Sequence, residues 1–174
     1  MVLLLLMAVL VGPALDIFVD PGKNDVSISD DRIKVDLLDT AEDSLVGDVL
    51  DFINPSPDQP LYFAPGRAFY TEGFQVKNTG DIPIRFRIYI SDDVGPDRER
   101  FREAFELFIT TDPAAISSQE RLTVFEGRLA PGESSDTFHL VVQMQETAGN
   151  EFQGKTYSGI GITVYAVAAD AEGE

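Results

Sequence analysis

The stretch Tyr157-Ser158-Gly159-Ile160-Gly161-Ile162-Thr163-Val164-Tyr165-Ala166-Val167 decides the fold. Its residues alternate, with positions 157, 159, 161, 163 and 165 on one side and positions 160, 162, 164 and 166 on the other. A period of two, made by β-branched and aromatic residues, predicts a half-buried β-strand. Residues 146–154, just before it, are rich in residue types that suit tight turns. Because the whole last strand region, residues 143–169, is long, we expect its strand in the middle of a sheet.

Several other segments show the same period of two. The clearest is residues 82–90, whose expected core positions are Ile82, Ile84, Phe86, Ile88 and Ile90. Together with residues 69–77, this segment predicts a hairpin-like pair of strands around Asn78-Thr79-Gly80-Asp81. Further short strands are expected at residues 26–29, 33–37 and 122–125. One more is expected at residues 137–144, with Phe138, Leu140 and Val142 facing inward.

Two segments depart from this pattern. Residues 97–110 have Phe101, Phe105 and Phe108 at helical spacing, which predicts an amphipathic helix, although residues 105–109 also suit a strand. Residues 41–53 allow either a short helix capped by Asp43 and Ser44 or an irregular strand and loop. Many short strands and few helical segments together predict an all-β, two-sheet sandwich with one or two short helices in its connections.

Length and charge set the domain organisation. At 174 residues the chain predicts one domain, residues 15–169, preceded by an apolar segment, residues 1–14, and followed by an acidic tail, residues 170–174. Thirty acidic and thirteen basic residues give a formal charge of −17. Such a surface repels nucleic acid, so we expect no nucleic-acid partner. The chain has no cysteine, which excludes disulfides and thiolate chemistry.

The N-terminal segment has two interpretations. Residues 1–11 are an unbroken apolar run with the length of a signal-peptide core, too short for a stable membrane span, and Ala14 suits signal-peptidase cleavage. The basic residues that normally precede such a core are missing, so a retained apolar segment is the alternative. Leu15, Ile17 and Val19 then alternate around Phe18. They predict either an edge strand of the chain's own sheet or a donor strand for a neighbouring subunit.

The sequence carries no recognisable catalytic set, so we expect a protein that is not an enzyme and has no catalytic residues. Its one histidine, His139, points outward on a predicted strand, and neither a nucleophile-elbow motif nor a zinc-binding His-Glu-x-x-His is present. We expect no cofactor and no metal ligand. The acidic pairs Asp30-Asp31, Glu42-Asp43 and Asp92-Asp93 leave weak calcium binding open, because calcium takes hard oxygen ligands.

Three motifs occur in the order in which one family has them. The first is Pro65-Gly66 followed by residues 74–87, in which Asn78 and Gly80 form a turn; the second is the turn at residues 129–134. The third is residues 146–154, which include Asn150, Phe152, Gln153 and Gly154. With these motifs, residues 61–169 resemble the TasA/camelysin family of secreted biofilm-matrix and cell-surface proteins.

The resemblance implies a jelly-roll-like form of the sandwich and a location in the extracellular matrix or on the cell surface. It also implies a structural subunit of extracellular fibres or pili, which polymerises with copies of itself by N-terminal donor-strand complementation. Leu15, Ile17, Phe18 and Val19 are the candidate donor residues, and an anchoring or nucleating accessory protein is a further expected partner. The alternatives are a monomeric surface accessory or cation-binding module and a camelysin-like surface peptidase. The peptidase is disfavoured because its metal ligands are missing.

Overall fold

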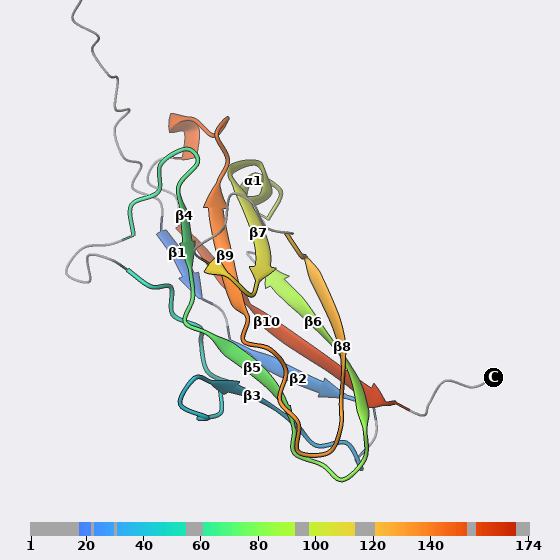
Figure 1. Cartoon of the computed structure of the whole chain (residues 1–174). Helices are drawn as coiled ribbons and strands as arrows, with labels where there is room; N and C mark the ends of the chain where they lie inside the picture. The colour runs from blue at the N-terminus through green and yellow to red at the C-terminus, as the bar shows by residue number, and fades with distance from the viewer. Residues whose placement is uncertain are drawn as a thin grey trace, which may run out of the picture.

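One sheet is built around β10 (Thr156–Ala168), as the computed structural model shows (Figure 1). β6 (Ile84–Asp92) runs antiparallel to β10, and β8 (Val124–Leu129) pairs with the other side of β6. On the opposite side of β10, β1 (Phe18–Pro21) and β2 (Asp25–Ile28) pair in parallel with successive parts of the strand. The predicted central position of the last strand is therefore confirmed.

The structure describes residues 18–21, 23–29, 31–54, 61–92, 98–113, 121–152 and 156–169. Several predictions concern residues outside these ranges. They are the predictions for residues 1–14, Leu15, Ile17, Gln153, Gly154 and the acidic tail 170–174.

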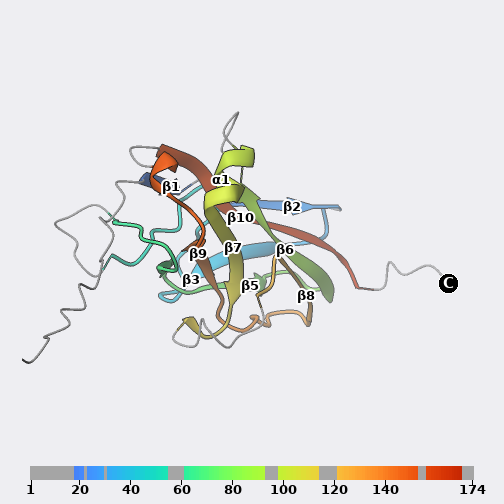
Figure 2. The same cartoon turned by 90° about the horizontal axis from the view of Figure 1, so that it is seen from above.

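A second layer faces the first. In it, β3 (Val35–Asp39) pairs with β5 (Phe74–Asn78), and β9 (His139–Met144) pairs with both β4 (Ala68–Tyr70) and β7 (Phe105–Thr110). Isolated bridges join β5 to the chain just before β9, so the layer is continuous from β3 to β7. Seen from above, β2 and β3 follow each other along the chain but lie in different layers (Figure 2).

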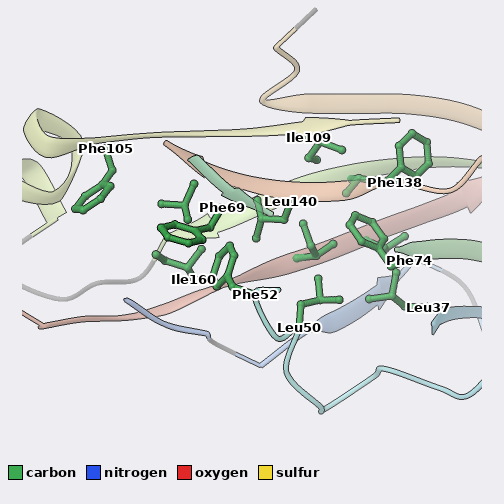
Figure 3. Close-up of a cluster of buried hydrophobic side chains, with 14 of the residues drawn as sticks. Leu37, Leu50, Phe52, Phe69, Phe74, Phe105, Ile109, Phe138, Leu140 and Ile160 are labelled. Carbon is green, nitrogen blue, oxygen red and sulfur yellow. The ribbon is translucent and has the colours of Figure 1, made fainter. Parts of the chain in front are cut away.

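The core lies between the two layers. The inward positions of β6, Ile84, Phe86 and Ile88, are buried as predicted, whereas Ile82 and Ile90 pack half-buried at its margin. Figure 3 shows Phe69 and Leu140 of the second layer beside Ile160 of β10. Each fully buried side chain of this size contributes about 1.5–3 kcal/mol to the hydrophobic stabilisation of the fold.

The all-β sandwich is thus confirmed. The helical segments among the described residues include α1 (Arg98–Ala104), which leads directly into β7, and η3 (Asn150–Phe152), which lies between β9 and β10. The strand order does not by itself establish jelly-roll connectivity, which stays a prediction.

The expected hairpin around residues 78–81 is wrong. β5 and β6 do not pair with each other, because the chain crosses from one layer to the other at this point. Buried Asn78 makes the corner: its Nδ2 donates to the carbonyl oxygens of Ile82 (2.8 Å) and Leu129 (3.3 Å), and its Oδ1 accepts from Gly80 N–H (3.0 Å). These bonds direct the chain away from β5, so a tight two-stranded turn does not form.

The two ambiguous segments are also resolved. The helix predicted over residues 97–110 is too long, because it ends at Ala104 and residues 105–110 form a full ladder with β9. The helix alternative for residues 41–53 is wrong. Asp39 Oδ1 accepts from the N–H groups of Ala41 and Asp43 (both 2.8 Å), which closes a turn where the helix would begin.

Candidate self-assembly site

β1 occupies the end of the strand order, beside the first residues of β10. Phe18 pairs with Thr156, Val19 with Tyr157, and Asp20 with Ser158. The register then shifts, so that Pro21 pairs with Ile160. Of the four predicted assembly residues, Phe18 and Val19 therefore lie on a short edge strand, while Leu15 and Ile17 lie outside the described residues.

The shift of register has its cause in β10. Gly159, which the ladder skips, has φ +88°, a left-handed conformation that glycine adopts without strain. This irregularity reverses the alternation of β10, so Tyr157 faces the same way as buried Ile160. The predicted grouping of Tyr157 with Thr163 and Tyr165 is therefore wrong: Tyr157 is buried, with 2% of its surface exposed.

Tyr157 connects the β1 ladder to an aromatic cluster at the end of the sandwich. Its ring centroid lies 4.9 Å from that of Phe101 on α1 and 5.9 Å from that of Phe105 on β7. Phe105 in turn packs edge-on against Phe63 at 4.9 Å. The part of β10 that pairs with β1 is consequently fixed by core contacts on its inner side.

Asn24 anchors the chain between the end of the β1 ladder at Pro21 and the start of the β2 ladder at Asp25. Its Oδ1 accepts a hydrogen bond from Ile162 N–H of β10 (3.1 Å), and its own N–H donates to the Asp48 carbonyl oxygen (2.8 Å). Gly47 N–H donates to the Asn24 carbonyl oxygen (2.9 Å), and the Asn24 residue is buried. Sequence reasoning missed this residue, because an Asn between two strands reads as an ordinary turn residue and its partner lies 138 positions away.

A second edge could also receive a strand. β7 pairs with β9 on one side, and on the other side the described residues give it only the bridge between Ile109 and Leu122. Backbone groups alternate along a strand, so those of Leu107 face the same open side as those of Ile109. Beside this edge lies a pocket of about 520 Å³, lined by apolar groups that include Ile90, Leu107 and Val124.

The motif residues have structural roles at separate places. Asn78 and Gly80 form the corner between the layers, and buried Phe152 ends η3, which begins at Asn150. Predicted motif residues Gln153 and Gly154 lie outside the described part of the chain. The Asn-x-Gly pattern in the sequence predicted a turn at this corner. The hydrogen bond from Asn78 to the Leu129 carbonyl oxygen could not be predicted from it.

The described residues offer little for catalysis or metal binding. His139 Nδ1 lies 2.9 Å from the Thr71 carbonyl oxygen, which can only accept a hydrogen bond, so Nδ1 is the donor. Within the described ranges, no three His, Asp or Glu side chains come together in a way that could hold a metal ion. The same ranges contain no helix with the length and apolarity needed to cross a membrane.

Comparison of the sequence with protein-family models and with curated proteins finds no match. The resemblance to the TasA/camelysin family therefore rests on the motif residues alone and stays a prediction.

Proposed function

We propose that the protein is a structural subunit of extracellular fibres, in which β1 of each copy pairs with β10 of a neighbouring copy. The observation that carries this proposal is the form of the β1–β10 ladder. It is four residues long, lies at the end of the strand order, and contains a shift of register between Asp20 and Pro21, before the separate ladder of β2 begins at Asp25. A strand held in this way can leave without displacing β2, which has its own ladder with β10.

The exchange has a simple thermodynamic basis. The same backbone hydrogen bonds form whether β1 pairs with its own β10 or with that of a neighbour, so the two arrangements differ little in contact energy. The balance depends on the subunit concentration relative to the effective concentration of the tethered strand. Because each copy supplies one donor and one acceptor, exchange that does not close into a ring continues as a fibre.

Secretion to the extracellular matrix or cell surface belongs to the same proposal. It is supported by the apolar run at residues 1–11 and by the resemblance to the TasA/camelysin family. An accessory protein that anchors or nucleates the fibre is a further proposed partner.

One observation favours a second candidate function, a monomeric surface module that presents its acidic surface to cations or to a cationic partner. In the single chain, β1 completes its own sheet by pairing with β10 of the same copy. Because β1 of the same copy already pairs with the backbone of β10, such a chain needs no neighbouring copy to form these hydrogen bonds.

Introduced cysteines test the proposal directly, because the chain has none of its own. Asp20 and Ser158 are partners across the β1–β10 ladder, and adjacent strands bring such positions within the range of a disulfide. A chain that carries both Asp20→Cys and Ser158→Cys is expected to lock closed on oxidation, to form no fibres, and to regain assembly when reduced. Mixed fibres of the two single variants are expected to give cross-linked dimers.

A matched control uses the neighbouring ladder. Asp25 and Thr163 are partners in the parallel pairing of β2 with β10, which the proposal leaves within each copy. Mixed fibres of Asp25→Cys and Thr163→Cys should therefore not cross-link. Cross-links from this pair would mean that β2 is exchanged together with β1, and the proposal that β2 stays within its own copy would be wrong.

Electron microscopy of the full chain and of a chain lacking residues 1–20 completes the test. Fibres from the full chain and monomers from the folded shorter chain are expected. Monomers from both would favour the surface module. Fibres from both would overturn exchange of β1. A different result would be fibres that need residues 1–20 but give no cross-link between positions 20 and 158. If Leu107→Arg abolishes these fibres, the donor strand pairs with the open edge of β7 and not with β10.

A further inference from the structure

The outward face of the sheet carries a pocket that the proposed fibre contact does not use. It has a volume of about 510 Å³ and lies over β8, β6 and the end of β10. The register of the strands builds it in rows: Arg85 lies between Arg128 and Val167, and the next row places Arg87 between Glu126 and Tyr165. Because Ile84, Phe86 and Ile88 face the core, the alternating residues Arg85, Arg87 and Tyr89 of β6 face this pocket.

The charge of this pocket is opposite to that of the whole molecule. Three of the chain's thirteen basic residues line it, whereas the chain carries a formal charge of −17. Arg85 and Arg128 are direct cross-strand partners, so two positive charges occupy neighbouring positions on one face. A concentration of guanidinium groups favours a carboxylate or phosphate group, because the planar fork of arginine matches both in a bidentate manner.

Arg87 is held in place by two neighbours. Its Nε lies 2.5 Å from Glu126 Oε1, and its Nη1 donates to the Tyr89 hydroxyl oxygen (3.4 Å). The hydrogen bond with Tyr89 and the negative charge of Glu126 both raise the pKa of Arg87. The side chains of Arg87 and Glu126 are 52% and 60% exposed, so this fixed pair is open to a ligand.

Glu126 restricts the class of anion. A phosphate group carries about −1.5 to −2 charges at pH 7, so the carboxylate of Glu126 repels it more strongly than it repels a singly charged carboxylate. A ligand that carries hydroxyl groups next to its anionic group would donate hydrogen bonds to Glu126 instead. Tyr165, which is 38% exposed, and half-buried Tyr89 add aromatic surfaces on which a sugar ring can pack.

We infer that this pocket binds a carboxylated sugar, with the uronate carboxyl group at Arg85, Arg87 and Arg128, sugar hydroxyl groups toward Glu126, and the ring against Tyr165. The volume is in the range that holds a small ligand. Long polyanions such as nucleic acid are disfavoured, because the rest of the surface repels them. The site is independent of the β1–β10 ladder and does not require fibres.

The test is titration of the full chain with glucuronate and with a dimeric uronate, followed by NMR chemical-shift changes at constant ionic strength near ~0.15 M. Glucose and inorganic phosphate are the comparison ligands. We expect both uronates to bind and to shift signals of residues on β6, β8 and β10. Arg87→Gln and the double variant Arg85→Gln/Arg128→Gln should each weaken binding about tenfold or more, as expected for loss of charge-assisted hydrogen bonds.

Two further variants keep the test decisive if the arginine variants fold poorly. Tyr165→Ala, at an exposed position, should weaken binding about threefold or more through loss of ring contact. Arg100→Gln removes an exposed arginine of α1, outside the pocket, and should leave binding unchanged.

Three outcomes would overturn the inference. The first is phosphate binding as tightly as glucuronate, and the second is uronate binding that no pocket variant alters. The third is absence of uronate binding together with self-association that Arg85→Gln/Arg128→Gln removes. In that case the face would be a contact with the acidic surface of a second copy.

Discussion

Asn24 Oδ1 accepts a hydrogen bond from Ile162 N–H at 3.1 Å, so one side chain fills the gap between the ladders of β1 and β2. The amide takes the place of a backbone carbonyl at a point where the register prevents normal pairing. Asn24 therefore lies between β1, which we propose is exchanged, and β2, which stays paired within its own copy.

Asn24→Ala should lower the free energy of unfolding by about 1–3 kcal/mol, because it leaves the buried Ile162 N–H without its acceptor. Urea denaturation of the chain lacking residues 1–20 measures this loss apart from any exchange of β1. Ser27→Ala, at an exposed position on β2, is the matched control and should change stability by less than about 0.5 kcal/mol. Equal stability of the two variants would mean that Asn24 is not an anchor.

Asn78→Ala should also destabilise the fold, by about 2 kcal/mol or more, since it removes the donors for the Ile82 and Leu129 carbonyl oxygens. Thermal unfolding followed by circular dichroism would show the loss. The exposed neighbour Thr79 provides the control substitution Thr79→Ala. A melting temperature for Asn78→Ala that equals that of the control would contradict the assignment of this corner.

Phe101→Ala should cost about 3–5 kcal/mol, the range for truncating a buried phenylalanine. The Phe101 ring stacks on Phe105 with centroids 4.9 Å apart and holds α1 over the aromatic cluster. Phe101→Leu should lose less, because it refills part of the space. Chemical denaturation compares the two, and Arg100→Ala on the exposed face of α1 serves as control. A loss below that of Phe101→Leu would argue against this packing.

Gly127→Ala tests the close contact between β8 and β6. A Cβ at Gly127 would meet Phe86 Cε1 at 2.6 Å and Phe125 Cε1 at 3.2 Å, so the buried Phe86 ring would have to shift. We expect a loss of about 1–3 kcal/mol from overpacking, measured by urea denaturation. Val124→Ala, on the exposed part of the same strand, should change much less. No difference between them would show that the ring adapts freely.

Salt should promote fibre formation. Copies with a formal charge of −17 repel one another, and the range of that repulsion falls from about 10 Å at 0.1 M to about 3 Å at 1 M salt. Light scattering across this range, on the full chain and on the chain lacking residues 1–20, would follow assembly. A decrease in assembly as salt rises would be the opposite of this expectation.

The sequence predicted the layers better than the corners. Alternation at Ile84, Phe86 and Ile88 reports burial directly, because a strand repeats every two residues. The alternation predicted the wrong side for Tyr157, because the positive φ of Gly159 interrupts the alternation and turns the Tyr157 side chain inward. Phe105 was ambiguous from the sequence alone. Its spacing from Phe101 suits a helix, whereas its partner in the strand ladder, Met144, lies far away in the sequence.

The candidate site could be anticipated only in part. The alternation around Phe18 pointed to a terminal strand, but neither its parallel partner nor the register shift before its last residue is encoded nearby. Asn24, Arg85 and Arg128 gain their roles from neighbours on distant strands. Such roles appear only when the strand order is known.

The pairing of Phe18 with Thr156 joins the first and the last of the strands that the structure describes. During synthesis β1 emerges more than a hundred residues before its partner, so closure is among the last steps of folding, and contacts of such long range form slowly. β1 would then pair either with β10 of its own copy or with β10 of a neighbouring copy at the time when newly synthesised chains are most concentrated. Dilute refolding should yield closed single copies, and concentrated refolding should yield polymers from the same sequence.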